Sequence, residues 1–194
     1  MNKKIVKKYI TPRIKTDKVS TSFFTPFGSE MGPLLATCSC TAVPGGHCIG
    51  DTCPSGCSCS CFLPGTMVKL SSGEKEIENV KVGDKIFSYD LTLRRTVINT
   101  VEKIFIHNNI NSYLVINKKI RVTPEHFFWL ENKNAWIKAA QLKKEDLLLT
   151  DLGNTVKVSS IETIDGVNVT VYNLHTEEEQ HNYFAEGILV HNWK

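Results

Sequence analysis

The chain has 194 residues, a formal net charge of +3 and seven cysteines. This length allows one domain of about 130 residues with an appendage and excludes two large domains. No apolar run is long enough to span a membrane or to form the core of a secretory signal, and no DNA-binding motif accompanies the basic residues. We therefore expect a cytoplasmic monomer that binds neither membranes nor nucleic acids.

The first 35 residues are predicted to form a basic, leader-like, disordered segment. Residues 1–60 contain seven basic and three acidic residues, a net charge of +4, whereas residues 61–194 contain 16 basic and 17 acidic residues. The positive charge of the chain thus belongs to its N-terminal part, where clustered like charges favour a solvated chain.

Residues 36–60 form a segment rich in cysteine and glycine. It contains six of the seven cysteines: Cys38, Cys40, Cys48, Cys53, Cys57 and Cys59. With few large apolar side chains, it cannot bury enough surface to fold by the hydrophobic effect alone.

Several interpretations of this segment stay open. Six cysteines admit fifteen disulfide pairings, although the cytoplasm does not favour disulfides. Zinc binding is an alternative, but the spacing lacks paired C-x-x-C motifs, so we expect no metal or cofactor. The layout also weakly resembles precursors of ribosomally made peptides, in which case modifying enzymes would act on residues 1–60. A plain linker is the remaining interpretation.

From Met67 onward, short runs of alternating apolar and polar residues predict β-strands. In chain order they lie at 67–70, 75–77, 85–89, 96–106, 112–116, 119–122, 135–137, 156–164, 169–174, 182–185 and 188–190. Ser71–Glu74 is typical of a hairpin turn, and a single helical turn is expected near Pro124–Phe127. Helical periodicity is sustained nowhere, which indicates an all-β domain.

A weak internal repeat supports this prediction. Residues 77–86 are echoed by residues 139–148, and each copy places an acidic turn just before a strand. The echo suggests a duplicated β unit.

Three polar clusters lie at the start, middle and end of the β-rich region. They are C-F-L-P-G-T from Cys61, T-P-E-H from Thr123 to His126, and His181 with His191 and Asn192. Their order, spacing and residue types resemble the Hint family, which includes inteins, bacterial intein-like domains and the autoprocessing domain of hedgehog proteins. The resemblance covers residues 61–192 and leaves Trp193–Lys194 as a C-terminal dipeptide. It implies a horseshoe of short antiparallel strands with pseudo-twofold symmetry.

The resemblance also implies a single-turnover cleavage of the chain's own backbone. The Cys61 thiol would attack the carbonyl of Ser60 and form a thioester. His126 would donate a proton to the departing nitrogen, and Thr123 would orient the scissile peptide. Water, a thiol or an amine would then accept the acyl group, so residues 1–60 would be released or transferred.

At the other end, the resemblance implies that Asn192 cyclises and breaks the bond to Trp193. His191 and His181 would assist this intramolecular attack, in which proximity replaces a second reactant.

Two positions depart from the family pattern. Trp193 stands where splicing inteins have Cys, Ser or Thr, so ordinary splicing is disfavoured, and Asn173 stands where many members have a catalytic Asp. The alternative hypothesis is therefore a catalytically weak Hint scaffold that carries a metal-binding or disulfide-rich peptide.

Overall fold

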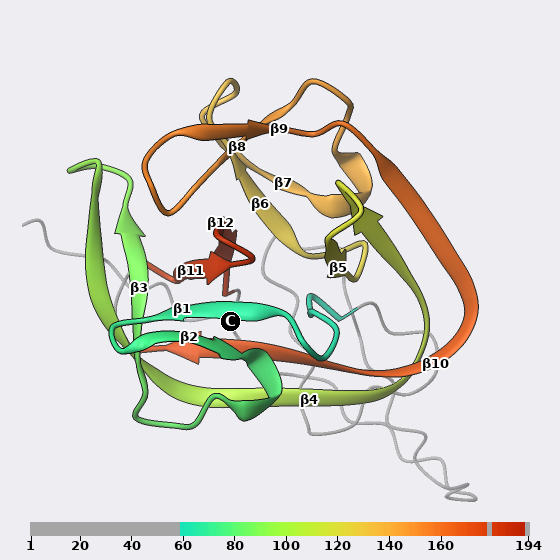
Figure 1. Cartoon of the computed structure of the whole chain (residues 1–194), viewed down its shortest axis with the longest axis horizontal. Helices are drawn as coiled ribbons and strands as arrows, with labels where there is room; N and C mark the ends of the chain where they lie inside the picture. The colour runs from blue at the N-terminus through green and yellow to red at the C-terminus, as the bar shows by residue number, and fades with distance from the viewer. Residues whose placement is uncertain (1–58, 178–179, 193–194) are drawn as a thin grey trace, which may run out of the picture. The chain divides into compact units, whose positions relative to one another are not determined.

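The computed structural model describes residues 59–177 and 180–192 (Figure 1). In these residues it contains two single-turn 3-10 helices, η1 (Ile77–Asn79) and η2 (Ala139–Gln141), and no α-helix. The strands are β1 (Met67–Leu70), β2 (Gly73–Glu76), β3 (Lys85–Asp90), β4 (Arg95–Ile116), β5 (Ile120–Val122), β6 (Phe127–Leu130), β7 (Ala135–Lys138), β8 (Leu147–Leu149), β9 (Thr155–Lys157), β10 (Ile161–Thr176), β11 (Asn182–Ala185) and β12 (Ile188–His191). The expected all-β class is confirmed.

Some sequence predictions concern parts of the chain outside these residues. They are the leader-like segment 1–35, the cysteine-rich segment 36–60 except Cys59 and Ser60, and the dipeptide Trp193–Lys194. The assignments of these segments stay predictions.

The twelve strands form one sheet in the order β10-β4-β3-β1-β11-β12-β6-β8-β9, and β2, β5 and β7 pair with β1, β4 and β6. Figure 1 shows the C-terminal hairpin of β11 and β12 in the middle of the other strands. Val68 of β1 pairs with Ala185 of β11, and Val190 of β12 pairs with Phe128 of β6. The start, middle and end of the domain therefore meet around one hairpin.

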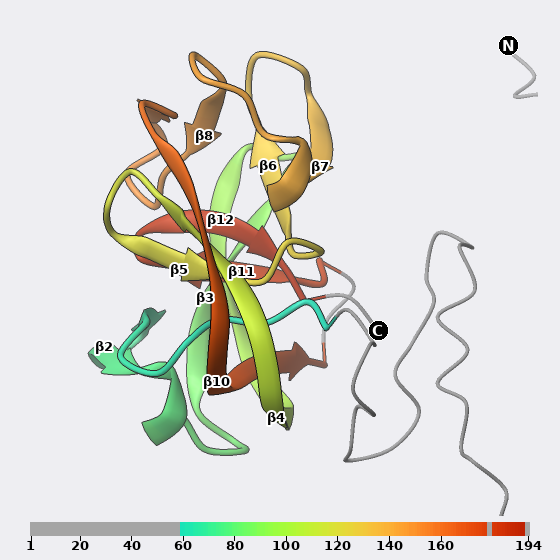
Figure 2. The same cartoon turned by 90° about the vertical axis from the view of Figure 1, so that its right-hand side faces the viewer.

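The two long strands β4 and β10 run side by side, as both Figure 1 and Figure 2 show. The sequence predicted a break near Asn109, but β4 continues through it with shifts in register, and Asn109 has a φ of 62°. In contrast, the single strand expected at 156–164 is divided into β9 and β10. Pairing with a neighbouring strand overrides local turn propensity, which explains both differences.

The internal repeat of the sequence corresponds to a repeat in the structure. In each copy a 3-10 helix, η1 or η2, precedes an aspartate, Asp84 or Asp146. Each carboxylate accepts a hydrogen bond of 2.9 Å from the backbone nitrogen three residues earlier, and each pairs with a lysine. The two units fold alike, in agreement with the predicted pseudo-twofold symmetry.

The main core lies under the C-terminal hairpin, and its largest side chains include Phe62, Phe128 and Tyr183, all fully buried. Burial of a side chain of this size stabilises a fold by roughly 1.5–3 kcal/mol. Asn182 anchors the hairpin to β3, because its side chain accepts a hydrogen bond from the nitrogen of Tyr89 at 2.8 Å and donates one to the carbonyl of Tyr89 at 2.9 Å. Core packing and the hydrogen bonds of Asn182 together hold the hairpin in place.

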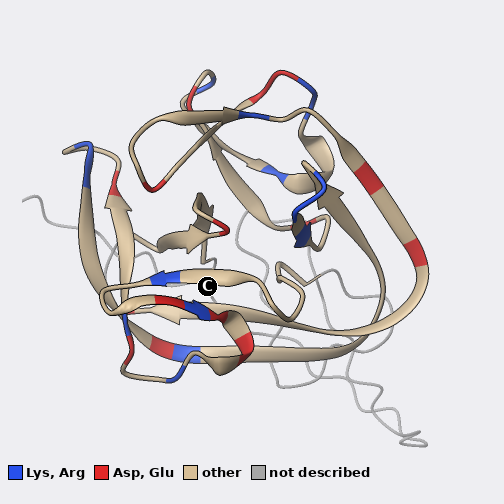
Figure 3. Cartoon of the chain, in the orientation of Figure 1, with Lys and Arg blue, Asp and Glu red and all other residues tan. Residues whose placement is uncertain are grey.

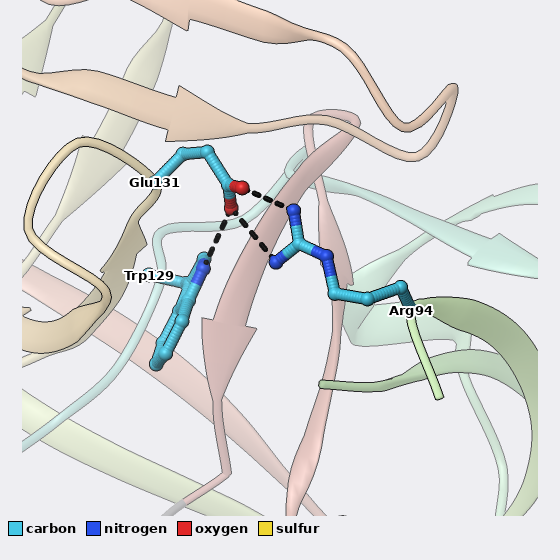
Figure 4. Close-up of polar contacts among 3 residues, drawn as sticks. All are labelled: Arg94, Trp129 and Glu131. Carbon is cyan, nitrogen blue, oxygen red and sulfur yellow. Dashed lines mark hydrogen bonds and ion pairs between the residues drawn. The ribbon is translucent and has the colours of Figure 1, made fainter. Parts of the chain in front are cut away.

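A polar contact joins the turn after β3 to the end of β6 (Figure 4). Arg94 forms a two-pronged ion pair with Glu131, whose Oε2 also accepts a hydrogen bond of 3.0 Å from the indole of Trp129. The Arg94 guanidinium holds the pKa of Glu131 below its usual value.

Among the described residues, no helix is long and apolar enough to cross a membrane.

Candidate functional site

Cys61 is buried at the start of the domain, with 1% of its surface exposed. It packs in a small apolar cluster with Cys59, Leu63 and Val171. The next residue, Phe62, exchanges two backbone hydrogen bonds of 2.8 Å with Tyr172 of β10. Strand pairing therefore fixes the backbone beside Cys61. Cys59, two residues earlier, is disulfide-bonded.

The Thr123 hydroxyl lies against the peptide that the sequence predicts to be cleaved. It accepts a hydrogen bond of 2.8 Å from the nitrogen of Cys61 and donates one to the carbonyl of Cys59. The Thr123 nitrogen also donates to the carbonyl of Cys61 at 2.9 Å. One buried side chain thus spans both sides of Ser60, whose own hydroxyl donates to the Glu125 carbonyl at 3.1 Å.

His126 is fully buried. Its ring packs on Phe62, with 4.3 Å between ring centroids. Burial lowers the pKa of His126 to about 3; the nearby Ser60 backbone opposes this fall, and the charge of His191 adds to it. His126 is therefore a neutral imidazole at pH 7.

The residues around His126 differ from the prediction in one respect. The helical turn expected near Pro124–Phe127 is wrong, because the chain makes a non-helical turn and enters β6 at Phe127. The turn is closed by the His126 nitrogen, which donates to the Thr123 carbonyl at 3.2 Å. A proline followed by aromatic strand residues favours this geometry over a helix.

Asn173 lies near Cys61 and has an unpredicted partner in Tyr183. The Asn173 side-chain oxygen accepts a hydrogen bond of 2.8 Å from the Leu174 nitrogen and one of 3.2 Å from the Tyr183 hydroxyl. Burial, together with the nearby charge of Cys61, raises the pKa of Tyr183 well above its usual value. Tyr183 is therefore a neutral donor close to the cysteine. Its place in H-N-Y-F, directly after the anchoring Asn182, was the only signal in the sequence.

Asn192 is fully buried at the end of the domain. Its backbone nitrogen donates to the His181 carbonyl at 2.8 Å, and its side-chain nitrogen donates to the Thr176 hydroxyl at 2.6 Å. The Thr176 contact was not predicted, because nothing in the local sequence distinguishes this threonine from other strand residues. Trp193 lies outside the described residues.

The histidines of the C-terminal region form a connected group. The rings of His175 and His181 are stacked 6.0 Å apart, and the ring of Trp136 lies 4.8 Å from that of His191. Burial lowers the pKa of His191 to about 4, and the charge of His181 contributes to this fall. Val190, the residue before His191, pairs with Phe128, two residues after His126, so the end of the domain lies beside its middle segment.

The expected site residues thus form two neighbouring groups. Cys61, Thr123 and His126 lie near the bond after Ser60, while His181, His191 and Asn192 lie at the C-terminal end of the domain.

No group of three or more metal-ligating side chains is found among the described residues. In Figure 3, acidic and basic residues are scattered over the described part, and this view shows no continuous basic stripe.

A sequence profile of the pretoxin HINT domain matches residues 67–193. The chain belongs to the pretoxin HINT domain family. The match begins at Met67, so the place of Cys61 in this Hint domain rests on its contacts. A search of curated proteins gave no significant match.

Solved structures include several similar folds. A bacterial intein-like domain from Clostridium thermocellum has 27% identity and a TM-score of 0.63, over 70% of this chain and 100% of that one. The gp41-1 intein has 24% identity and a TM-score of 0.55, over 70% and 100% of the two chains. A DnaB intein from Synechocystis has 17% identity and a TM-score of 0.58, over 69% and 99%. The two inteins share the fold with this Hint domain.

Proposed function

We propose that this Hint domain cleaves its own chain once, at the bond between Ser60 and Cys61, and so releases or transfers the cysteine-rich N-terminal peptide. The pretoxin HINT match and the intein-like fold support self-processing as the general class of activity. The observation that carries the specific proposal is the contact of Thr123 with the Cys61 nitrogen, beside the buried His126.

The first step is an acyl shift from nitrogen to sulfur. The Cys61 sulfur attacks the Ser60 carbonyl carbon, a C–S bond forms and the C–N bond breaks. The thiol proton ends on the new amino group of Cys61, so no outside reactant is consumed. An amide nitrogen is a poor leaving group unless it gains a proton as the bond breaks.

The depressed pKa of His126 indicates how that proton reaches the departing nitrogen. A neutral imidazole has no spare proton to give at pH 7, but it can accept the thiol proton and then pass it to the departing nitrogen. His126 is therefore proposed as a relay and not as an acid that begins in its charged form. The packing of the His126 ring on Phe62, the residue after Cys61, with 4.3 Å between ring centroids, supports this role.

The thioester would then be cleaved by water, a thiol or an amine, and the second cleavage would follow cyclisation of Asn192 before Trp193. Trp193 has no nucleophilic side chain, which disfavours splicing. Enzymes that modify the cysteines of residues 1–60 remain proposed partners. Cys59 is disulfide-bonded, which favours disulfide formation over zinc binding for this one cysteine.

Intact mass spectrometry of the freshly purified full chain, with and without dithiothreitol, tests the proposal. The parent and a Cys59→Ala control should yield fragments that break after Ser60, faster with the thiol, and Cys61→Ala should not. Cys59→Ala is a matched control because it removes a disulfide-bonded cysteine two residues from the proposed nucleophile. Processing of Cys61→Ala at the parent rate would refute the acyl shift. An unchanged full-length mass in every sample would instead favour a catalytically weak scaffold.

A further inference from the structure

Thr176, at the end of β10, makes the shortest side-chain contact of Asn192. Its hydroxyl oxygen accepts a hydrogen bond of 2.6 Å from Nδ2 of Asn192, and both residues have 0% of their surface exposed. Two buried groups in direct contact do not exchange partners with water. The contact is made to the nitrogen that would act as nucleophile in cyclisation.

The other half of the Asn192 amide is arranged differently. Its Oδ1 is buried and has no hydrogen-bond partner among the described residues. Buried amide groups are normally satisfied at both atoms, so an orphaned oxygen is unusual and suggests a functional constraint. The backbone of Asn192 is fixed independently by the hydrogen bond to His181. Thr176 is therefore the contact that sets where the amide nitrogen lies.

We propose that Thr176 takes part in cleavage before Trp193 by holding Nδ2 of Asn192 and polarising its N–H bond. This inference rests on the proposed cyclisation of Asn192. In that step Nδ2 bonds to the backbone carbonyl carbon of Asn192, the bond to the Trp193 nitrogen breaks, and one proton moves from Nδ2 to that nitrogen. No other reactant is needed.

A hydroxyl group suits this step chemically. The lone pair of an amide nitrogen is delocalised, so the nitrogen gains nucleophilic character only as its proton is drawn away. A hydroxyl both accepts and donates hydrogen bonds, so it can receive the N–H of Asn192 without adding a charge to a buried site. A buried carboxylate would require its own stabilising partner.

The strand around Thr176 is irregular in a way that fits this role. The register of β10 against β4 shifts between His175 and Thr176, which pair with Lys103 and Val101. Glu102 is thereby left opposite no residue of β10, and its carboxylate lies 3.3 Å from Nε2 of His175. Irregularities of this kind re-aim side chains at strand ends next to reactive sites.

The test compares Thr176→Val, Thr176→Ser and a matched Thr163→Val control, which changes an exposed threonine of the same strand. All are made in the full chain with Cys61→Ala, so only the C-terminal cleavage is followed. Intact mass spectrometry measures the rate at which Trp193–Lys194 is lost. Thermal unfolding of each variant shows whether the fold is retained.

We expect Thr176→Val to slow the loss of the dipeptide by about three- to tenfold, the effect of one lost hydrogen bond, with Thr176→Ser and Thr163→Val close to the parent rate. If the valine variant does not fold, Thr176→Cys replaces it, because sulfur is a weak acceptor and should also slow cleavage. Parent-like cleavage in a folded Thr176→Val or Thr176→Cys chain would overturn the inference. A Cys61→Ala chain with Thr176 intact that never loses the dipeptide would also overturn it, while the acyl shift would be judged separately from the N-terminal fragments of the chain that keeps Cys61.

Discussion

Thr123 and Cys61 donate backbone hydrogen bonds to each other in opposite directions. The Cys61 nitrogen donates to the Thr123 hydroxyl at 2.8 Å, and the Thr123 nitrogen donates to the Cys61 carbonyl at 2.9 Å. Thr123 thus holds Cys61 at both its backbone nitrogen and its carbonyl. A side-chain hydroxyl at the nitrogen of a scissile bond can both orient that nitrogen and stay with it as the bond breaks.

Replacing this hydroxyl should therefore impair the N-terminal cleavage selectively. We expect Thr123→Val to slow cleavage after Ser60 by about tenfold or more, because preorganised hydrogen bonds at a reacting peptide contribute at least this much. Thr123→Ser should retain most of the rate. Fragment masses over time measure the effect, and Thr163→Val provides the control. Equal rates for Thr123→Val and the parent would exclude a role of the hydroxyl.

His126 should make the stability of the domain depend on pH. The pKa of His126 is about 3 in the folded protein, whereas the ordinary value of 6.5 applies to the unfolded chain. Between these two pH values the unfolded chain binds more protons than the folded protein, so the free energy of unfolding rises with pH. Acidification from pH 7 to about 4.5 should thus remove about 2–3 kcal/mol through this group alone. Denaturant unfolding of Cys61→Ala chains with and without His126→Leu measures it. The leucine variant should lose less stability on acidification, and identical losses would contradict the burial argument.

Tyr183 should contribute to both stability and processing. Tyr183→Phe removes the hydroxyl that donates to Asn173, and we expect a loss of about 1 kcal/mol in the free energy of unfolding. Cleavage after Ser60 should also slow, because Asn173 loses a restraint beside Cys61. Tyr172→Phe, which removes a hydroxyl from a less buried tyrosine, is the control for both readouts. A Tyr183→Phe chain as stable and as fast as the control would show that the hydrogen bond is dispensable.

The disulfide at Cys59 predicts that two kinds of reductant act differently. Dithiothreitol can reduce a disulfide and also cleave a thioester, whereas a phosphine reduces disulfides without acting as the acyl acceptor. If the thioester forms at Cys61, cleavage after Ser60 should respond to dithiothreitol and not to phosphine alone. The response should persist in Cys59→Ala. If phosphine speeds cleavage after Ser60 in the parent but not in Cys59→Ala, reduction of the disulfide would instead explain the response to reductants.

Much of the fold could be predicted because its signals are local. Alternating apolar residues indicated most strands, and the repeat at Ile77 and Ala139 anticipated two units that fold alike. The continuity of β4 through Asn109 could not be predicted, because it depends on pairing with β10, which lies more than 50 residues away in the chain. Local sequence contains no information on such a partner.

The candidate site shows the same division. Cys61, Thr123 and His126 could be proposed from the sequence because each lies in a distinctive short motif. Thr176 and Tyr183 were missed because their importance comes from what they contact, Asn192 and Asn173, and not from their neighbours in sequence. The depressed pKa of His126 was equally hidden, since burial is a property of the assembled core.

The C-terminal hairpin β11–β12 lies between β1 and β6, and β1 begins six residues after Cys61. The beginning and the end of the domain are therefore neighbours in space. Such a chain is suited to circular permutation: a short linker could join residue 192 to residue 61, and new termini could open at the exposed turn after β3. The same strands would then assemble from a chain in which the proposed nucleophile and the terminal asparagine are adjacent in sequence.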